Sequence, residues 1–358
     1  MGLPPQWNRL YRLPSAWRKT SQSMESLWQL YLAREPSLGP CEVFFLPAAW
    51  PRMSSTHHFW VPGVVTLPYV LLYKCVVTKS FVTSENHAEE MKRYPYDRVL
   101  FHPGHICSTC KFLKPARSKH CSFCKACVSR HDHHCVWLMN CVGANNYKYF
   151  LSLLLAVSVL LIYGTLLGYS LLWQTLREIV PLDVQAAMKS WSMYLHVWSI
   201  VITRDPKIGT VTLLMLMTAP LAVAFLAYHT YLIWAGMTTN ESAKWSDWKE
   251  DVLDGFVFKA KRSEIRCAPP HVDLSGQPWP VQSDQILVTD GQPPLEGYVL
   301  DDASNRVTYR GDANRSRPID RQWVELHHTR DLENIYDMGF RRNLVDALGL
   351  PVREKFYT

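Results

Sequence analysis

The chain has 358 residues, 48% of them hydrophobic, and a formal net charge of +7. Its length allows more than one domain, and its apolar residues, with 14 Trp and 17 Tyr, are clustered rather than evenly spread. A basic chain can meet nucleic acid, anionic lipid or an acidic cofactor, and the long apolar stretches described below favour lipid and cofactor over nucleic acid.

Residues 1–58 are rich in Trp, Pro and Arg and lack the order of basic, apolar and small residues that marks a signal peptide. The apolar patch at residues 43–46 is far too short to cross a bilayer. We therefore expect an irregular or interfacial N-terminus, without a transmembrane segment of its own.

Three stretches are long and apolar enough to be transmembrane helices. Residues 59–78 form the first; the alternative, a buried helix of a soluble domain, is disfavoured by its length and its lack of acidic residues. Residues 149–173 carry no charge and have aromatic anchors at both ends, and residues 209–236 form the third stretch. The loop between them, residues 174–208, is aromatic and is expected at the lumenal membrane interface.

Seven of the 10 cysteines lie in the polar segment 79–148, in C-x2-C steps with interleaved His. This is the spacing of tetrahedral zinc sites, whereas a disulfide framework would spread its cysteines over a small secreted domain. The other three cysteines are isolated: Cys41, Cys75 and Cys267.

Two Cys3His zinc sites would use six of these seven cysteines and leave one thiol over. The candidate is Cys135, which directly follows Asp132, His133 and His134. A free thiol adds nothing to a structural zinc module and is open to oxidation. His133 is then a candidate base and Asp132 its orienting carboxylate, which is the arrangement of an activated nucleophile.

The C-terminal region, residues 237–358, contains three recognisable parts. Residues 238–241, Thr-Thr-Asn-Glu, fit a helix cap. Residues 262–325 are rich in Pro, Gly, Asp and Ser, and we expect a flexible or loosely folded insertion with a weak strand-like piece at 285–288. Residues 334–343 have an Asn-x-aromatic-x2-Gly-x3-Asn pattern, which alone indicates only a turn entering an amphipathic helix.

The charges of the loops predict the orientation in the membrane. Residues 79–148 contain eleven Lys and Arg, against four in residues 174–208. The positive-inside rule therefore places the cysteine-rich segment and residues 237–358 in the cytosol, where a reducing environment suits thiolates. Three transmembrane helices then put the basic residues 1–58 in the lumen.

Residues 107–150 resemble the cysteine-rich domain of the DHHC family of protein S-acyltransferases (palmitoyltransferases). The resemblance rests on residues 114–121 and 131–137, which are similar to the fungal endoplasmic-reticulum members that acylate SNARE proteins. Residues 238–241 match the family's TTxE motif, and residues 334–343 its C-terminal motif. The resemblance implies an α-helical polytopic membrane protein of the endoplasmic reticulum with a cytosolic two-zinc domain; the family usually has four transmembrane helices, of which this sequence shows three.

The same resemblance assigns the site residues. His133, held by Asp132, would deprotonate Cys135, which would attack palmitoyl-CoA and pass the acyl group to cysteines of membrane-associated proteins, with SNAREs as candidates. Zinc would be structural. One ion would be bound by Cys107, Cys110, His120 and Cys127, and the other by Cys121, Cys124, His134 and Cys141.

The acyl-CoA needs further contacts. Its acyl chain would lie in an apolar cavity between residues 149–173 and 209–236, with Trp137 near the thioester. Its phosphates would contact Lys114, Arg117 and Lys119; the alternative for each cation is a solvated basic face or an anionic-lipid contact.

Two other functions would use similar cysteine spacing. A membrane-anchored zinc module of the RING type would recruit partners without acyl transfer, and a zinc ribbon would bind nucleic acid. Both would use every cysteine as a ligand, and neither needs the Asp-His-His-Cys sequence between two transmembrane helices. Two zinc ions with one alkylatable thiol would favour the transferase.

Overall fold

The structure is a computed structural model that describes residues 44–181, 190–265, 279, 285–288, 293–296, 298–301, 306–309 and 318–350. The chain forms two compact units. One contains Met1–Trp60 and Ile162–Met217, and the other Val61–Leu161 and Thr218–Thr358.

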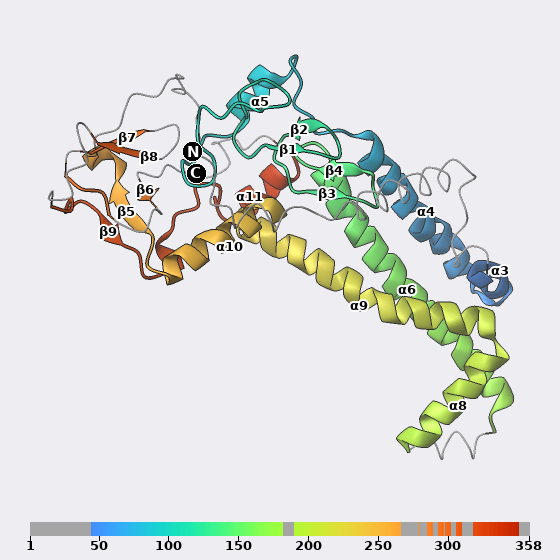
Figure 1. Ribbon diagram of the computed structural model, residues 1–358. Helices are drawn as coiled ribbons and strands as arrows, with labels where there is room; N and C mark the ends of the chain where they lie inside the picture. Colours follow the sequence, from blue (N-terminus) through green and yellow to red (C-terminus); the bar gives the residue numbers. More distant parts are fainter. Residues whose placement is uncertain are drawn as a thin grey trace, which may run out of the picture. The chain divides into compact units, whose positions relative to one another are not determined.

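Three long apolar helices correspond to the three predicted transmembrane segments: α4 (Ser55–Val77), α6 (Tyr147–Ile179) and α9 (Pro206–Trp234) (Figure 1). At a rise of about 1.5 Å per residue, even the shortest exceeds the roughly 30 Å of a bilayer's apolar core. Less than a third of the most apolar window of each helix is buried within the protein. Because apolar surface exposed on this scale is stable only in lipid, the chain is a multi-pass membrane protein.

The first unit contains the short helices α3 (Leu46–Ala49) and η2 (Trp50–Arg52), and α8 (Trp191–Arg204). Arg52 donates to the Asp205 carboxylate (2.5 Å) and to the backbone oxygen of Leu171 (2.8 Å). Gly168 of α6 faces Thr212 of α9. A Cβ at position 168 would lie 1.9 Å from the Thr212 hydroxyl, so glycine lets α6 and α9 approach each other. The irregular N-terminus predicted for residues 1–58 is thus partly helical, and residues 1–43 lie outside the described part.

The second unit contains the cysteine-rich domain, which begins with α5 (His87–Arg93). Two β-hairpins follow, and both are antiparallel. Their strands are β1 (Lys119–Cys121) with β2 (Ala126–Val128), and β3 (His133–Cys135) with β4 (Asn140–Val142).

Two buried asparagines join this domain to the end of α4. The Asn140 amide donates to the backbone oxygens of Cys75 and Thr78, at 2.9 Å each. The Asn146 amide donates to Cys141 (2.9 Å) and to Thr78 (3.2 Å). The bonds to Cys75 and Thr78 satisfy carbonyls at the end of α4 that the last turn of a helix leaves unpaired, and they fix the β3–β4 hairpin to a transmembrane helix.

The C-terminal region starts with α10 (Thr239–Leu253), capped by Thr238 and Glu241 in a full capping box, as the sequence predicts. Short elements follow, and α11 (Phe340–Ala347) is the last. The strands β5 (Phe258–Lys261), β6 (Gln285–Val288) and β9 (Val324–Glu325) form a sheet in the order β6-β5-β9. β7 (Tyr298–Asp301) and β8 (Arg306–Tyr309) form a hairpin, and η3 (Arg262–Glu264) and η4 (Thr329–Asp331) are single turns.

The described parts of the insertion 262–325, expected to be flexible or loosely folded, include short strands. Tyr298 and Trp323 are buried in one apolar cluster, and the Trp323 indole donates to the Tyr298 hydroxyl at 2.9 Å. The strand-like piece at 285–288 is β6. A few large apolar side chains are enough to order strands within a Pro- and Gly-rich sequence.

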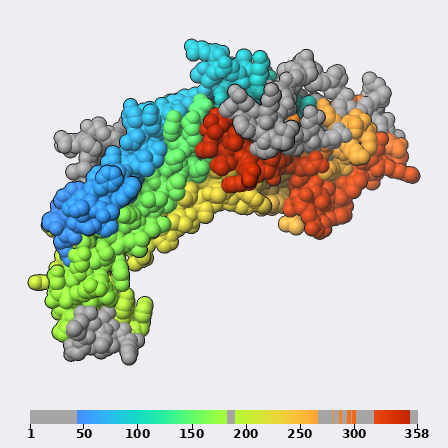
Figure 2. Space-filling view, turned by 180° about the vertical axis from the view of Figure 1, so that it is seen from behind, coloured from blue at the N-terminus to red at the C-terminus, as the bar shows by residue number. Residues whose placement is uncertain are grey.

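The C-terminal motif returns to the end of α9. The Asn334 amide donates to the backbone oxygen of Ala235 (3.1 Å), and the Asn343 amide donates to that of Trp234 (3.2 Å). Ala347 of α11 belongs to the same buried cluster as Tyr147 and Phe150, and in Figure 2 the red C-terminal residues lie against the green start of α6. The motif thus caps a transmembrane helix.

Candidate active site and metal centres

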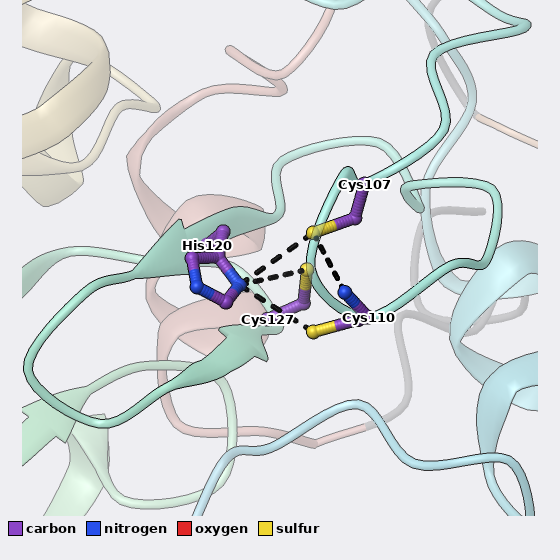
Figure 3. A group of neighbouring side chains, drawn as sticks. All are labelled: Cys107, Cys110, His120 and Cys127. Carbon is purple, nitrogen blue, oxygen red and sulfur yellow. Dashed lines mark hydrogen bonds between the residues drawn. The ribbon is translucent and has the colours of Figure 1, made fainter.

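The first group of metal-binding side chains consists of Cys107, Cys110, His120 and Cys127, whose ligand atoms all lie within 4.8 Å of one another (Figure 3). The Nδ1 atom of His120 is 3.5, 3.4 and 3.9 Å from the three sulfurs. A zinc tetrahedron with bonds of about 2.0–2.3 Å has edges of about 3.5–3.8 Å. The residues therefore fit a Cys3His zinc site.

The second group consists of Cys121, Cys124, His134 and Cys141. The His134 Nδ1 atom is 3.6, 3.4 and 3.6 Å from the three sulfurs, and two of the sulfurs, those of Cys124 and Cys141, lie 3.6 Å apart. These distances also match a zinc tetrahedron. The two groups bring together the same eight side chains that the sequence resemblance assigns.

The local sequence explains how each group forms. Hairpin pairing places His120 opposite Cys127, and His134 opposite Cys141, so one His and one Cys point to the same face. The remaining two ligands of each group come from the C-x2-C turn of the preceding segment. Zinc would therefore join each turn to the next hairpin in a domain with few apolar residues, and its role there would be structural.

Cys135 belongs to neither group and lies opposite Asn140 at the end of β3. Burial raises the pKa of its thiol, but hydrogen bonds from His133 and from the backbone amides of Leu138 and Trp137 outweigh burial, and the net pKa lies below the usual value. This leftover thiol is therefore held in a setting that favours the thiolate.

His133 links that thiol to a carboxylate. Its Nδ1 lies 2.7 Å from Oδ2 of Asp132, which leaves the other ring nitrogen for Cys135. Burial lowers the pKa of His133, but hydrogen bonds to Asp132 and Cys135 raise it to about 9. The three side chains thus form a Cys-His-Asp arrangement in which the imidazole can hold the proton of the thiol.

Asp132 is in turn held by the start of α10. Thr239 donates to its carboxylate from the backbone amide (2.8 Å) and from the hydroxyl (3.0 Å). Burial raises the pKa of Asp132, but the hydrogen bonds from His133 and Thr239 outweigh burial and lower it. The sequence analysis missed this role of Thr239, for which the only signal was a second Thr beside the helix cap.

Arg117 is buried, and its charge is paired with Glu241. Its side chain is 1% exposed, and its Nε and Nη2 atoms donate to the two carboxylate oxygens of Glu241 at 2.7 and 2.6 Å. The rings of Tyr94 and Tyr336 lie on the guanidinium at 4.9 and 4.4 Å. Because it is buried and paired, we correct the expected phosphate contact of Arg117 to a structural role.

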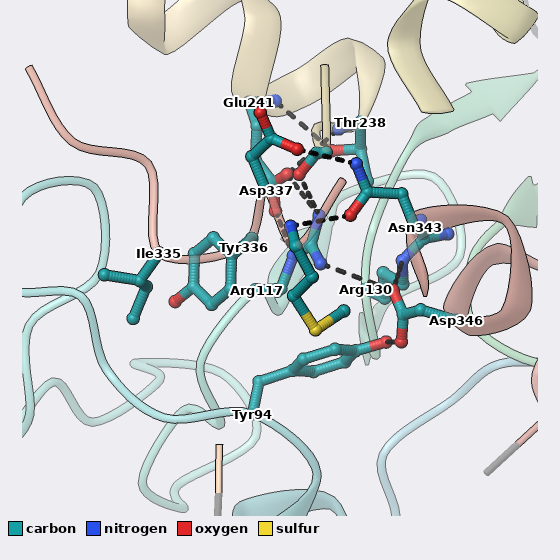
Figure 4. Close-up of polar contacts among 12 residues, drawn as sticks. Tyr94, Arg117, Arg130, Thr238, Glu241, Ile335, Tyr336, Asp337, Asn343 and Asp346 are labelled. Atoms are coloured by element: carbon teal, nitrogen blue, oxygen red, sulfur yellow. Dashed lines mark hydrogen bonds and ion pairs between the residues drawn. The ribbon is translucent and has the colours of Figure 1, made fainter. Parts of the chain in front are cut away.

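A second buried arginine, Arg130, completes this network (Figure 4). Asp346 of α11 lies 3.3 Å from Arg130 and 3.6 Å from Arg117, and it accepts a hydrogen bond of 2.8 Å from the Tyr94 hydroxyl. One carboxylate from the C-terminal helix therefore helps to neutralise two cations of the cysteine-rich domain.

Lys114 and Lys119 line a pocket of about 270 Å³, and none of the residues described in its lining is acidic. The Lys119 ammonium donates to the side-chain oxygen of Asn240 at 2.9 Å. Three further basic side chains, which the sequence analysis did not single out, complete the pocket: His102, His105 and Lys244. Trp137 lies elsewhere, 71% exposed at the turn between β3 and β4.

Comparisons with known proteins give one matching family model and several similar proteins. A family model described as DHHC palmitoyltransferase matches residues 100–246. A protein of Aspergillus fumigatus named Palmitoyltransferase swf1 is 58% identical over 318 residues, which cover 87% of this chain and 83% of the relative. The protein of that name from Emericella nidulans is 56% identical over 86% of this chain and 76% of its own length. In Saccharomyces cerevisiae, Palmitoyltransferase SWF1 is 30% identical over 80% of this chain and 74% of its own length.

Proposed function

Because the chain belongs to the DHHC family of palmitoyltransferases and is a protein S-palmitoyltransferase, we propose that Cys135 carries the palmitoyl group as a thioester. The observation that supports this role is that Cys135 lies outside both metal-binding groups and is hydrogen-bonded to His133, which is itself held by Asp132. A thiolate next to a positioned imidazole is the nucleophile that thioester exchange requires.

The proposed reaction has two steps. His133 takes the proton of Cys135, the thiolate attacks the carbonyl carbon of palmitoyl-CoA, and the bond to the CoA sulfur breaks. The CoA thiolate leaves and takes the proton from the imidazolium. In the second step His133 accepts the proton of an acceptor cysteine, whose thiolate attacks the acyl-enzyme and releases the Cys135 thiolate, to which the imidazolium returns the proton. Zinc in the two Cys3His groups would hold the hairpins and take part in neither step.

We propose that the pocket of Lys114 and Lys119 binds the phosphates of acyl-CoA. Lys244 contributes a further cation, its ammonium 4.1 Å from the centre of the Phe101 ring. Cations without an acidic neighbour in the same lining favour a multiply charged anion. The acyl chain would lie along the apolar surface next to Cys135, Phe150 and Ile233, with Trp137 near the thioester, because each buried CH2 contributes about 0.8 kcal/mol.

We further propose that the catalytic domain faces the cytosol and that the enzyme is located in the endoplasmic reticulum. The excess of Lys and Arg in residues 79–148 supports the orientation. The likeness of residues 114–121 to the fungal members of that compartment supports the location. Acceptors would be proteins with a cysteine close to the cytosolic membrane surface, SNARE proteins among them.

The experiment is incubation of the purified protein with an alkyne-labelled palmitoyl-CoA. We expect a hydroxylamine-sensitive label on Cys135, found by mass spectrometry of the peptide. Lys114→Ala with Lys119→Ala should raise the concentration of acyl-CoA required for half-maximal labelling. A protein with two bound zinc ions that takes no label would instead support a zinc module that recruits partners.

A further inference from the structure

The cysteine-rich domain contains a structural repeat of fourteen residues that ends in the active site. Cys107, Cys121 and Cys135 are spaced by fourteen residues, and each begins a tight turn. In each turn the residue four positions after the cysteine has a left-handed backbone conformation, which non-glycine residues seldom adopt. These residues are Lys111 (φ 63°), Lys125 (φ 54°) and Met139 (φ 46°).

The strand pairing around each turn repeats as well. The residue just before each of these cysteines pairs with the residue six positions after that cysteine. The pairs are Ile106 with Leu113, His120 with Cys127, and His134 with Cys141. The three segments therefore share one backbone shape, and the third segment includes β3, β4 and Cys135.

In the first two turns this backbone holds the sulfur of a metal ligand. The amide of Cys110 donates to the sulfur of Cys107, and the amide of Cys124 to that of Cys121, at 3.4 Å each; Figure 3 draws the first of these bonds. In the third turn the amide of Leu138, at the same position, donates to the backbone oxygen of Cys135 at 3.2 Å, and it helps to lower the pKa of the Cys135 thiol. The backbone shape that holds a zinc ligand in the first two turns is thus also the shape of the turn that holds Cys135.

The third turn differs from the others in its second ligand position. Cys110 and Cys124 supply the second thiolate of the first two turns, and the equivalent residue of the third is Leu138. Leu138 is 3% exposed and packs in the cluster that contains Cys135, Tyr147 and Phe150. Without a second thiolate, Cys135 cannot chelate a metal through a C-x2-C pair.

We propose that the active-site segment 133–142 is a third zinc-type turn from which metal is excluded, and that Leu138 is the residue that excludes it. The surroundings make the exclusion necessary, because Cys135 lies beside His133 and close to Asp132, which are both types of metal ligand. A thiolate bound to zinc shares its lone pairs with the ion and is no longer free to attack a thioester. Leu138 thus preserves the nucleophile while the turn's backbone amides position its sulfur.

The inference rests on the proposed function only for the role of Cys135 as nucleophile, and the test counts metal independently of activity. The variant is Leu138→Cys, which restores the second thiolate next to Cys135 and His133. Purified with added zinc, it should contain a third zinc ion per chain, whereas the wild type should contain two. Zinc should also protect Cys135 of the variant from iodoacetamide, and its labelling by palmitoyl-CoA should fall at least about tenfold, since three protein ligands suffice for a zinc site.

Matched variants isolate the position of the thiol. Leu138→Val removes the leucine without adding a thiol, and Val136→Cys adds an exposed thiol at the wrong spacing; both should keep two zinc ions. Leu138→Cys combined with Cys135→Ser should also return to two. If Leu138→Cys fails to fold, Leu138→His supplies a different second ligand at the same position.

Two results would overturn the proposal. One is a folded Leu138→Cys or Leu138→His protein that keeps two zinc ions and shows no zinc-dependent protection of Cys135. The other is a wild-type protein that itself binds a third zinc at Cys135. Failure of the proposed function would look different, because Cys135→Ala would then still accept the palmitoyl label while the zinc count of Leu138→Cys still rose to three.

Discussion

Thr239 contacts Asp132 through two hydrogen bonds, one from its backbone amide and one from its hydroxyl, at 2.8 and 3.0 Å. The two residues are 107 positions apart in the chain, and their contact joins the start of α10 to the strand that carries His133, the proposed base. The orientation of His133 therefore depends on a helix that follows the last transmembrane segment.

We expect Thr239→Val to weaken self-acylation while leaving both zinc ions bound, because the substitution removes the hydroxyl but keeps the amide. A hydrogen bond to a charged group contributes about 1.5–3 kcal/mol, so a loss of about tenfold or more in rate is expected. Single-turnover labelling with palmitoyl-CoA measures it. Thr239→Ser should recover most of the rate, and equal rates in the Val variant and the wild type would show that Asp132 does not need the hydroxyl.

Cys135→Ala should abolish self-acylation and retain two zinc ions with unchanged thermal unfolding, since Cys135 lies outside both metal groups. Cys121→Ala, in contrast, should lower both the zinc content and the unfolding temperature, because it removes one ligand of a closed tetrahedral site. Metal analysis and thermal unfolding in detergent compare the two. Loss of a zinc ion in Cys135→Ala would identify this thiol as a ligand and contradict its role as nucleophile.

The two adjacent histidines should behave differently. His133→Ala should slow self-acylation and keep both zinc ions, because its ring contacts Asp132 and Cys135. His134→Ala should lose metal as well as activity, because its Nδ1 lies 3.4–3.6 Å from three sulfurs. Zinc analysis of both variants decides the matter, and an equal loss of zinc would mean that the roles of the two histidines are wrongly assigned.

Arg117→Leu should destabilise the protein strongly, because it leaves the buried Glu241 carboxylate without its partner. Breaking one side of a buried ion pair costs about 3–5 kcal/mol. Arg117→Leu combined with Glu241→Leu should be more stable than Arg117→Leu alone, since no charge is left unpaired. Resistance to proteolysis in detergent ranks the variants. A double variant no more stable than the single one would show that the stacking of Arg117 on Tyr94 and Tyr336 matters more than its charge.

The predicted orientation can be tested by glycosylation. An Asn-X-Ser sequon inserted next to Ser190, in the loop between the second and third transmembrane segments, should be glycosylated in microsomes. The natural sequon at Asn240, on the proposed cytosolic side, should remain unmodified. Glycosylation at Asn240 with none at the inserted site would contradict the proposed topology and place residues 237–358 in the lumen.

Local patterns were sufficient to predict a zinc-type cysteine cluster and the transmembrane helices, whereas the division of the eight ligands between two ions came from the resemblance to the family. A C-x2-C turn brings two thiolates together within four residues, and twenty apolar residues span a bilayer regardless of what surrounds them. The ends of the helices were less predictable: α6 continues to Ile179 instead of ending at Trp173, because polar residues can continue a helix beyond the membrane.

The interactions that the sequence did not reveal connect distant residues. Arg117 is positive and near the active site, and only the position of Glu241, 124 residues away, shows that its charge is already paired. The strands of the insertion depend on Trp323 packing with Tyr298. The fourteen-residue repeat was present in the sequence, but Leu138 breaks the cysteine pattern that would have shown it.

The position of Asp346 has a consequence for how the protein is made. Arg117 and Arg130 are both buried in the cysteine-rich domain, and Asp346 is shared between them. During synthesis the hairpins leave the ribosome long before α11 does, although domains tend to fold as they emerge. Until Asp346 is available, Arg117 and Arg130 must either stay in contact with water or be buried without the carboxylate that they share. The final packing of the domain therefore waits for α11, and a chain that stops before this helix would lack the carboxylate that Arg117 and Arg130 share.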